Sequence, residues 1–395
     1  MLPTDLAVTA LPPTALPPVN RIDAPVADAP APAARLLAFH FTGSGREYFR
    51  IWVINLLLSL ATLGIYSAWA KVRRLQYFDR NTSLAGASFD FHGEPKAILR
   101  GRVLAVVLLA AYQYAFGFSL AFGMVVVALL LLALPYMMRG ALRFRLGNTS
   151  WRGLRFHFSG STPLAYRTYL APIAIFLLPG AVVAVMGSTP WSLLPFALYL
   201  AWPAMYGAMK RFQYGHIMYG DQHSTTELPL VKFFGIYVRG LLLASAVIAV
   251  FVGLGVVSQA LEGERKTAAL AVLGFGVATI GTLMGYVLLG PYQQVRVFNL
   301  CLPRTQFPGV RFVSTLSARG FTGLQLKNLA FTLLSLGLYR PFAVVSAYRY
   351  RLAHLSLEVA AKAKADFDHV LGSVKPAGGA LGDGTADFLG VDLSW

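Results

Sequence analysis

Two long stretches of the chain contain no charged residue, and they limit the possible folds more than any other feature. Residues 103–138 form 36 uncharged residues and residues 168–209 form 42. A helix that crosses a bilayer needs about 20 apolar residues, so each stretch can supply two spans joined by a turn. Residues 240–261 and 267–291 make a third pair around a short charged segment. The sequence therefore predicts three membrane hairpins.

The composition excludes a soluble protein. Of the 395 residues, 56% are hydrophobic and 13% are charged, whereas a soluble domain carries about 25% charged residues. The net charge of +17 is typical either of nucleic-acid binding or of a membrane protein with basic cytoplasmic loops. Soluble nucleic-acid-binding proteins do not contain such uncharged stretches. We therefore expect membrane lipids as partners and no nucleic acid, and the sequence identifies no protein partner.

The loops between the hairpins are basic, which predicts their side of the membrane. Segments 139–167 and 292–327 carry Arg and Lys and no acidic residue, and segment 71–102 carries seven basic residues. Loops rich in Lys and Arg stay in the cytoplasm. Each hairpin is therefore expected to leave the cytoplasmic side and return to it.

The two ends of the chain differ from the middle. Residues 1–37 are rich in Pro and Ala, and residues 361–395 are Gly-rich and acidic. Such compositions bury little apolar surface. We expect two flexible tails around a membrane domain over residues 38–360.

One sequence repeat predicts two broken helices. Residues 55–77 align with residues 328–350 without a gap, with nine identities in 23 positions. The second copy contains Arg340 followed by Pro341, which disfavours an unbroken span because a central Arg is costly and the residue before Pro avoids helical geometry. We expect a helix, an elbow near Gly337 and a second helix in each copy, although a plain span remains an alternative.

A second repeat lies in the basic loops. Residues 81–93 match residues 148–160 at seven of 13 positions, residues 305–312 form a weaker copy, and residues 216–228 lie where a diverged copy is expected. Asn-Thr with a following Gly is typical of turns, and Phe-x-Phe alternates with the period of a strand. We predict small β-hairpins that could pair into one cytoplasmic layer. The expected fold is a membrane all-α, multi-pass bundle of three hairpins and two repeated broken-helix elbows, with small cytoplasmic β-hairpin elements.

The first elbow region resembles a known family. The residues that carry the resemblance are Phe41-x-Gly43, Glu47-Tyr48-Phe49, Asn55, Thr62-Leu63-Gly64-Ile65-Tyr66 and Trp69-Ala70-Lys71-Val72-Arg73. This pattern is similar to that of the YjgN family of bacterial multi-pass inner-membrane proteins of unknown function, over about residues 38–360. The resemblance implies a location in the bacterial inner membrane, and it implies no catalytic residues.

Signatures of catalysis and of cofactor binding are absent from the sequence. The apolar stretches contain no Asp or Glu, and the chain has no nucleophile elbow, Walker loop or dinucleotide fingerprint. Acidic residues of the basic loops, such as Asp79, are expected to form salt bridges. His40 and His157 occupy matching places in Phe-His-Phe, but a metal site needs three or four ligands. We expect no enzymatic activity, no cofactor and no metal.

Two groups of residues are candidate binding sites. Arginines near helix ends, interleaved with aromatic residues, are typical of sites for anionic lipid head groups; ordinary topology anchoring is the alternative reading. These arginines are Arg73, Arg74, Arg102, Arg139, Arg143, Arg145, Arg167 and Arg340. Broken helices in matching repeats are typical of transporter sites, although the same residues could simply cap the helices. The elbow residues are Asn55, Gly64, Tyr66, Asn328, Gly337 and Tyr339.

Three functions follow as hypotheses from these patterns. The leading one is a non-enzymatic inner-membrane protein that binds or handles an anionic lipid or amphiphile at the cytoplasmic leaflet. The second is a small-solute transporter or channel built on the paired elbows. The third is a membrane scaffold whose strand-bearing loops recruit a soluble partner.

Overall fold

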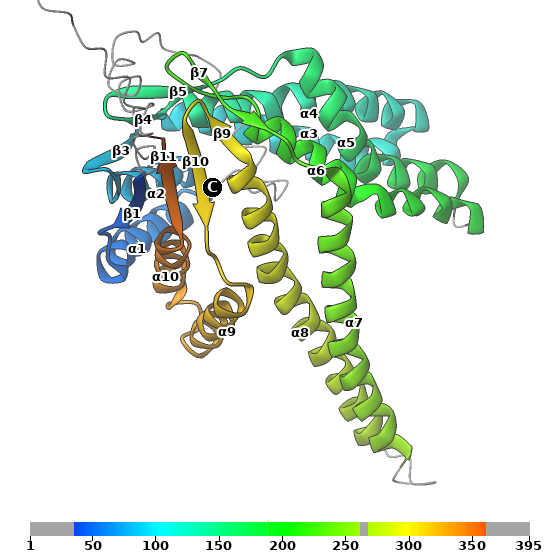
Figure 1. Ribbon diagram of the computed structural model, residues 1–395. Helices are drawn as coiled ribbons and strands as arrows, with labels where there is room; N and C mark the ends of the chain where they lie inside the picture. The colour runs from blue at the N-terminus through cyan, green and yellow to red at the C-terminus, as the bar shows by residue number, and fades with distance from the viewer. Residues whose placement is uncertain (1–34, 188, 261–267, 361–395) are drawn as a thin grey trace, which may run out of the picture. The chain divides into compact units, whose positions relative to one another are not determined.

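The computed structural model describes residues 35–187, 189–260 and 268–360 (Figure 1). The two expected tails lie outside these residues, with one exception. Arg35–Phe41 forms strand β1, so regular structure begins before the expected domain boundary at residue 38.

The described strands pair into a single antiparallel sheet of 11 strands, and the pairing joins distant parts of the chain. Its order is β7-β6-β5-β4-β3-β2-β1-β11-β10-β9-β8. The strands are β1, β2 (Thr82–Leu84), β3 (Ala87–Phe91), β4 (Thr149–Trp151), β5 (Leu154–Phe158), β6 (Ile217–Tyr219), β7 (Gln222–His223), β8 (Thr225–Thr226), β9 (Thr305–Phe307), β10 (Val310–Ser314) and β11 (Leu355–Val359).

Ser224 nearly closes this sheet on itself. The two edge strands, β7 and β8, are consecutive in the chain, and Ser224 is the residue between them. Its backbone N–H donates to the carbonyl of Ile217 at 2.8 Å, and its hydroxyl accepts from the Ile217 N–H at 2.9 Å. The hydroxyl also donates to the carbonyl of Tyr214 at 2.7 Å. The sheet therefore has the form of a nearly closed barrel, in which few strand edges are left unpaired.

The helices leave the sheet and return to it in pairs. The described helices are α1 (Gly45–Ala61), α2 (Ser67–Arg80), α3 (Pro95–Phe118), α4 (Leu120–Gly147), α5 (Thr162–Met186), α6 (Trp202–Tyr214), α7 (Leu230–Ala260), α8 (Ala268–Cys301), α9 (Ala318–Leu334) and α10 (Arg340–Ala353), with 3-10 helices η1 (Pro190–Ala201) and η2 (Leu302–Arg304). In each case the strand before the pair is hydrogen-bonded to the strand after it. Every described helical pair therefore starts and ends at two neighbouring strands of the sheet.

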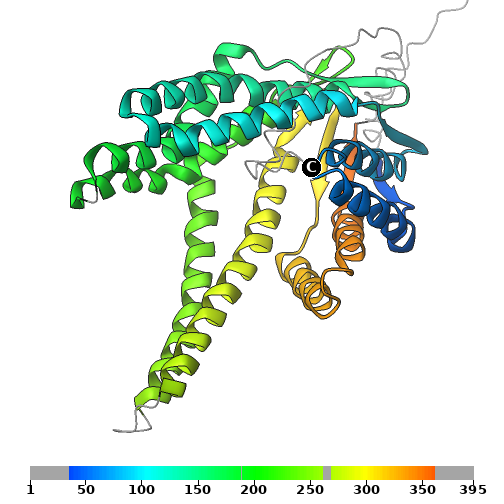
Figure 2. The same cartoon turned by 180° about the vertical axis from the view of Figure 1, so that it is seen from behind.

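Four segments among the described residues are long and apolar enough to cross a membrane: α3, α4, α5 and Leu230–Gly253 of α7. Helices α7 and α8 pack against each other, as both views show (Figures 1 and 2). The arm that returns from α5 differs from expectation, because it consists of η1 followed by the 13-residue α6. Pro190 and Pro203 stand in the first turns of η1 and α6, where a missing N–H costs least, and Pro195 lies inside η1.

Each of the two elbow regions is a pair of helices that turns back toward the sheet. Helices α1 and α9 each have 17 residues, about 25 Å, and are shorter than a typical span. Each pair turns through a leucine and a glycine with positive φ: 50° at Leu63 and 91° at Gly64, and 50° at Leu336 and 93° at Gly337. The breaks thus lie where the sequence repeat places them, and both regions return to the sheet that they left.

The expected all-α bundle is wrong. The helical pairs alternate along the chain with the strands of an extensive sheet, only four candidate spans are found in the described chain, and the β elements form one nearly closed body. The sequence repeats predicted small hairpins that could pair into one layer, but not a nearly closed sheet of 11 strands, because local patterns of three to five residues do not say which strands pair. The partners are remote: Arg35 of β1 lies opposite Val359 of β11.

Candidate functional site

The sheet and the helix ends that enter it enclose a cavity of about 230 Å³. An engineered cavity of about 150 Å³ holds one benzene ring, so this space suits a two-ring molecule or one short chain. Its lining is mostly apolar and comes from strands and helices along the whole described chain. The cavity is the best-formed internal site that the structure shows.

The lining is built from five equivalent units in the described chain, each with a helix end followed by a strand. The five strands concerned are β2, β4, β6, β9 and β11. The residue three positions before each of these strands forms the helix-end layer: Asp79, Leu146, Tyr214, Leu302 and Leu352. The first residue of each strand forms the strand layer: Thr82, Thr149, Ile217, Thr305 and Leu355. The third residue forms the turn layer: Leu84, Trp151, Tyr219, Phe307 and Leu357. All fifteen line the cavity.

Tight turns set this geometry. Strands β2 and β3 join through Ala85 and Gly86, with φ of 50° and 79°, and β4 and β5 join through Arg152 and Gly153, with φ of 49° and 78°. Two central residues with positive φ are the mark of a type I′ turn, whose twist suits a two-residue hairpin. These turns fix the register and so place the aromatic side chains inward.

Aromatic side chains form much of the wall. Phe39, Phe89 and Phe156 stack in series, with ring centroids 6.4 Å apart at each step. Trp151 lies 5.7 Å from Tyr219, whose hydroxyl donates to the Trp151 carbonyl at 3.1 Å. Flat apolar surfaces of this kind favour ring systems and acyl chains.

Asp79 is the charged member of the helix-end layer, where the other four units have Leu or Tyr. Its Oδ2 is buried and has no hydrogen-bond partner among the described residues. Burial raises the pKa of this carboxyl to about 6, with Arg145 lowering it and Asp90 raising it to lesser extents. The expected role of Asp79 in a salt bridge is therefore replaced by a position in the cavity wall.

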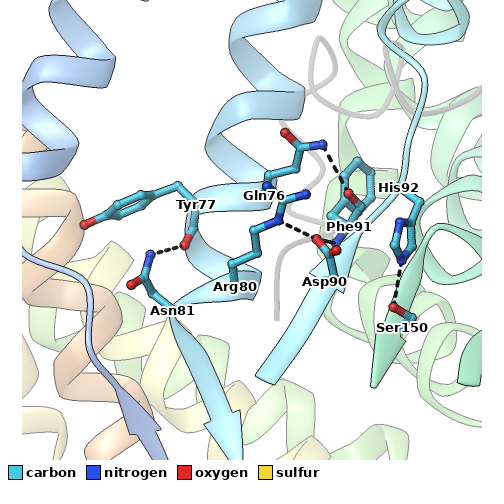
Figure 3. A network of polar contacts seen from close by, with 8 residues as sticks. All are labelled: Gln76, Tyr77, Arg80, Asn81, Asp90, Phe91, His92 and Ser150. Carbon is cyan, nitrogen blue, oxygen red and sulfur yellow. Dashed lines mark hydrogen bonds and ion pairs between the residues drawn. The ribbon is translucent and has the colours of Figure 1, made fainter. Parts of the chain in front are cut away.

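Contacts on both sides of Asp79 hold the last turn of α2 in place (Figure 3). The Gln76 amide donates to the carbonyl of Phe91 at 3.3 Å. The Arg80 guanidinium donates to the Asp90 carboxylate at 2.7 Å. Both contacts tie α2 to β3, and they leave Asp79 on the side that faces the cavity.

Two guanidinium groups lie at the same end of the cavity. Arg145 of α4 and Arg351 of α10 both line it, and both act electrostatically on the hydroxyl of Tyr348. Arg145 also lies over the ring of Phe91, 6.0 Å from its centroid. With Asp79 ionised, these three side chains carry a net positive charge.

Gln222 is the polar residue at the opposite end. Gln222 pairs with Tyr219 of the turn layer on the neighbouring strand. The residues that pair in the same way with the other four members of the turn layer are Leu37, Ala87, Leu154 and Val310. The Oε1 of Gln222 is buried and has no hydrogen-bond partner in the described chain. The cavity therefore has an orphaned acceptor at each end and an apolar middle.

The structure distributes the eight sequence-predicted arginines over several places, and Arg145 is the one that lines the cavity. Arg102 donates to the hydroxyl of Ser67, and Arg139 donates to the carbonyl of Gly160 at 2.6 Å. These two arginines hold helices and loops together.

The remaining arginines lie on helix surfaces. Arg73 lies over the ring of Tyr66, 5.7 Å from its centroid. Arg74 of α2 and Arg340 of α10 both lie near the hydroxyl of Tyr48. The structure thus brings these two together from different elbows. The last two, Arg143 on α4 and Arg167 on α5, are outside the cavity lining.

The expected elbow residues serve the elbows themselves. Asn328 donates to the carbonyl of Ala343 at 3.3 Å and to the hydroxyl of Ser346 at 3.0 Å, which joins α9 to α10. Asn55 is also buried, but its Oδ1 has no partner among the described residues. The residue that corresponds to Ser346 in the first copy is Arg73.

The aromatic elbow residues pack locally. Tyr66 stacks on Trp69 with ring centroids 6.1 Å apart, and Tyr339 stacks on Phe342 at 5.6 Å. Gly64 and Gly337 supply the positive φ of the turns. Among the described residues that line the cavity, none belongs to either elbow set.

The polar cavity residues that the sequence-based set misses include Asp79, Gln222 and Arg351. A signal for Asp79 exists in the loop repeat, because Asp79 stands where the second copy has Leu146. Gln222 lies in the diverged copy, where the alignment is too weak to show the substitution. No group of three or more His, Cys, Asp or Glu side chains in the described ranges is arranged to hold a metal ion.

The comparisons with known proteins agree with the family resemblance. A family described as bacterial protein of unknown function (DUF898) matches residues 36–388. Inner membrane protein YjgN of Escherichia coli strain K12 is 32% identical over 153 residues, which is 37% of each chain. Inner membrane protein YjgN of Salmonella typhimurium strain LT2 is 32% identical over 132 residues, 32% of each chain. The matched segments thus span about a third of the length of these relatives, and no solved structure matches.

The match over most of the chain confirms the expected family, and the relatives' names agree with the four apolar helices. The chain is thus a multi-pass inner-membrane protein that belongs to the DUF898 family of bacterial proteins of unknown function.

Proposed function

We propose that the protein binds a small anionic amphiphile in the cavity enclosed by its sheet, at the cytoplasmic leaflet, and performs no reaction on it. The cavity is the observation that carries the proposal. Its volume of about 230 Å³ and its aromatic wall fit an apolar body of limited size. A two-chain phospholipid is too large to be enclosed whole.

The charges at the helix-end layer support an anionic head group. Arg145 and Arg351 outnumber Asp79 in that part of the lining. A guanidinium group pairs well with a carboxylate or a phosphate. An amphiphile with one negative charge would therefore be bound with its head near these arginines and its apolar part between the strands.

The basic loops support a cytoplasmic position for the sheet. The strands lie in the same segments as the Arg-rich loops between the helices. Since loops rich in Lys and Arg remain on the cytoplasmic side, we place the whole sheet there. The cavity would then receive molecules from the inner leaflet or from the cytoplasm.

The test is mass spectrometry of the protein purified in mild detergent, with identification of every retained small molecule. We expect one anionic amphiphile in stoichiometric amount. Arg145→Gln combined with Arg351→Gln should reduce its retention at least tenfold, whereas Arg143→Gln combined with Arg340→Gln should leave it unchanged. The second pair is the matched control because both of its arginines lie outside the cavity lining.

A second variant tests the cavity itself. Leu84→Trp places in the first unit the residue that the second unit has at Trp151, and so fills part of the space. Retention should fall in this variant too. The proposal would be overturned if the wild-type protein and all variants retained only bulk membrane lipid, with no retained molecule whose amount falls in Leu84→Trp.

A further inference from the structure

The five units of the lining differ in ways that point to the ligand. At the helix-end layer four units have Leu or Tyr and one has Asp79. At the position opposite the turn layer four units have apolar residues and one has Gln222. A barrel built from equivalent units could be apolar at both positions. These two substitutions introduce polar atoms into an apolar wall, which is unfavourable unless the atoms find partners.

The other hydroxyl groups of the lining already have partners. Thr82, Thr149 and Thr305 each donate to the backbone carbonyl four residues earlier, at 2.7–3.0 Å. Tyr219 donates to the backbone as well. The Asp79 Oδ2 and the Gln222 Oε1 are different, because each is buried and accepts no hydrogen bond from the described residues.

Resting on the proposed function, we propose that the bound molecule carries a hydrogen-bond donor at each end of its apolar body, one for Asp79 and one for Gln222. Both orphaned atoms are oxygens, and a carboxylate oxygen or an amide oxygen accepts hydrogen bonds. Hydroxyl or amine groups are the matching donors. The ligand class is the compact anionic amphiphile of the proposed function with two added features. It carries a hydroxyl or amine beside its charged head group, for Asp79, and a second one at the far end of its apolar body, for Gln222.

The two ends of the lining explain why one donor is not enough. Asp79 lies in the last turn of α2, before the first strand residue, whereas Gln222 directly follows the β6–β7 turn at the far end of the strands. The strand layer and the turn layer lie between them. A molecule that reaches both oxygens therefore extends along the strands and fills the aromatic middle of the cavity.

The experiment uses naphthalene compounds as probes, titrated into the purified full-length protein in one detergent by calorimetry. We compare 2,6-dihydroxynaphthalene, which has donors at opposite ends, with 2,6-dimethoxynaphthalene, which has none. Binding of the first should be at least tenfold tighter, because a missing donor leaves a buried oxygen unpaired. This comparison needs no variant and so does not depend on a variant folding.

Variants then assign each end. Asp79→Leu and Gln222→Val introduce residues found in other units, and each should abolish most of the preference for the dihydroxy compound. Asp221→Leu, an exposed acid beside Gln222 and outside the lining, is the control and should keep the preference.

The outcomes separate this inference from the proposed function. Saturable binding of both probes with equal affinity would overturn the two-donor inference and leave the cavity as a binding site; ordered water at the two oxygens would give that result. Failure of both probes to bind, together with no species sensitive to Leu84→Trp, would overturn the proposed function as well.

Discussion

Leu37 of β1 lies directly opposite Leu357 of β11, although the two residues come from opposite ends of the described chain. This pairing places β1 between β11 and β2 in the sheet. The fifth unit of the cavity lining therefore consists of β11, the last strand, and β1, the first. The sheet cannot close until both ends of the membrane domain have been made. The fold therefore depends on contacts of very large sequence separation.

Loss of β11 should disrupt the whole sheet. A chain that ends after His354 lacks β11 and leaves the edges of β1 and β10 without a partner. We expect a lower melting temperature and aggregation in detergent, because unpaired strand edges associate. Size-exclusion chromatography and thermal melting measure this. A chain that ends after Ala360 keeps β11 and is the control, and equal behaviour of the two chains would contradict the role of this pairing.

Asp79 should make stability depend on pH. Its folded-state pKa of about 6 lies above the ordinary value of 3.8, so the folded state binds this proton more tightly than the unfolded state. The free energy of unfolding is then highest below about pH 4 and falls as the pH rises to about 6. The loss is on the order of 2–3 kcal/mol.

Thermal melting between pH 4 and pH 8 measures this dependence. The variant Asp79→Asn keeps the shape but does not titrate, so its melting temperature should fall less over this range. Identical pH profiles for the two proteins would exclude Asp79 as the source.

The elbow glycines should be sensitive to alanine. Gly337 has a φ of 93°, and an added Cβ would meet no atom within 4 Å, so the cost of Gly337→Ala comes from the backbone alone, about 1 kcal/mol. Gly323 lies within α9 and also has free space around it. Gly323→Ala should instead stabilise by about 0.5–1 kcal/mol. Chemical denaturation in detergent compares the free energies of unfolding of the two variants. A change of the same sign in both would argue against the turn geometry.

The two repeat asparagines should differ in their effect on stability. Asn328→Leu removes hydrogen bonds to Ala343 and Ser346 and leaves buried groups unpaired, at a cost of about 1–3 kcal/mol. Asn55→Leu removes a buried oxygen that has no partner in the described chain, so its cost should be smaller. Melting temperatures of the two variants decide this. A larger loss for Asn55→Leu would show that Asn55 has a role outside the elbow.

The sheet should lie on one side of the membrane. Cysteines placed at Asp221 and at Gln306, both exposed in the strand region, should react with a membrane-impermeant maleimide in inverted vesicles and not in intact spheroplasts. A cysteine at Ser119, between α3 and α4, should show the opposite pattern. Native Cys301 is buried and gives the background. If the cysteines placed at Asp221 and Gln306 reacted from opposite sides of the membrane, a single sheet on one side would be ruled out.

Local patterns in the sequence predicted much of the membrane part. The uncharged stretch 103–138 contains most of α3 and α4, and the turn expected within 168–209 follows α5 at Gly187, which has a φ of 67°. Charge and hydropathy decide these features, and both can be read from a short window. The second arm of the pair at 168–209 was not predictable in this way, because an apolar run does not distinguish a continuous α-helix from a 3-10 helix followed by the short α6.

The sheet and its cavity could not be predicted to the same extent. The Phe-x-Phe repeats indicated strands, but β8 has two residues and β1 pairs with the far end of the chain. Arg145 was in the candidate set for its position at a helix end, which it shares with arginines that only hold loops. What distinguishes it is that Asp79 of α2, Arg145 of α4 and Arg351 of α10 line the same cavity, which is a property of the closed sheet.

Because each helical pair is inserted between two strands that bind each other, the length of a pair has no effect on the register of the sheet. The same sheet carries the 17-residue helices α1 and α9 and the much longer α7 and α8. Neighbouring pairs also pack on one another, α4 on α5, α6 on α7 and α8 on α9. The sheet thus determines which helices stand side by side, and the far tips of the pairs are where length can vary without changing that order.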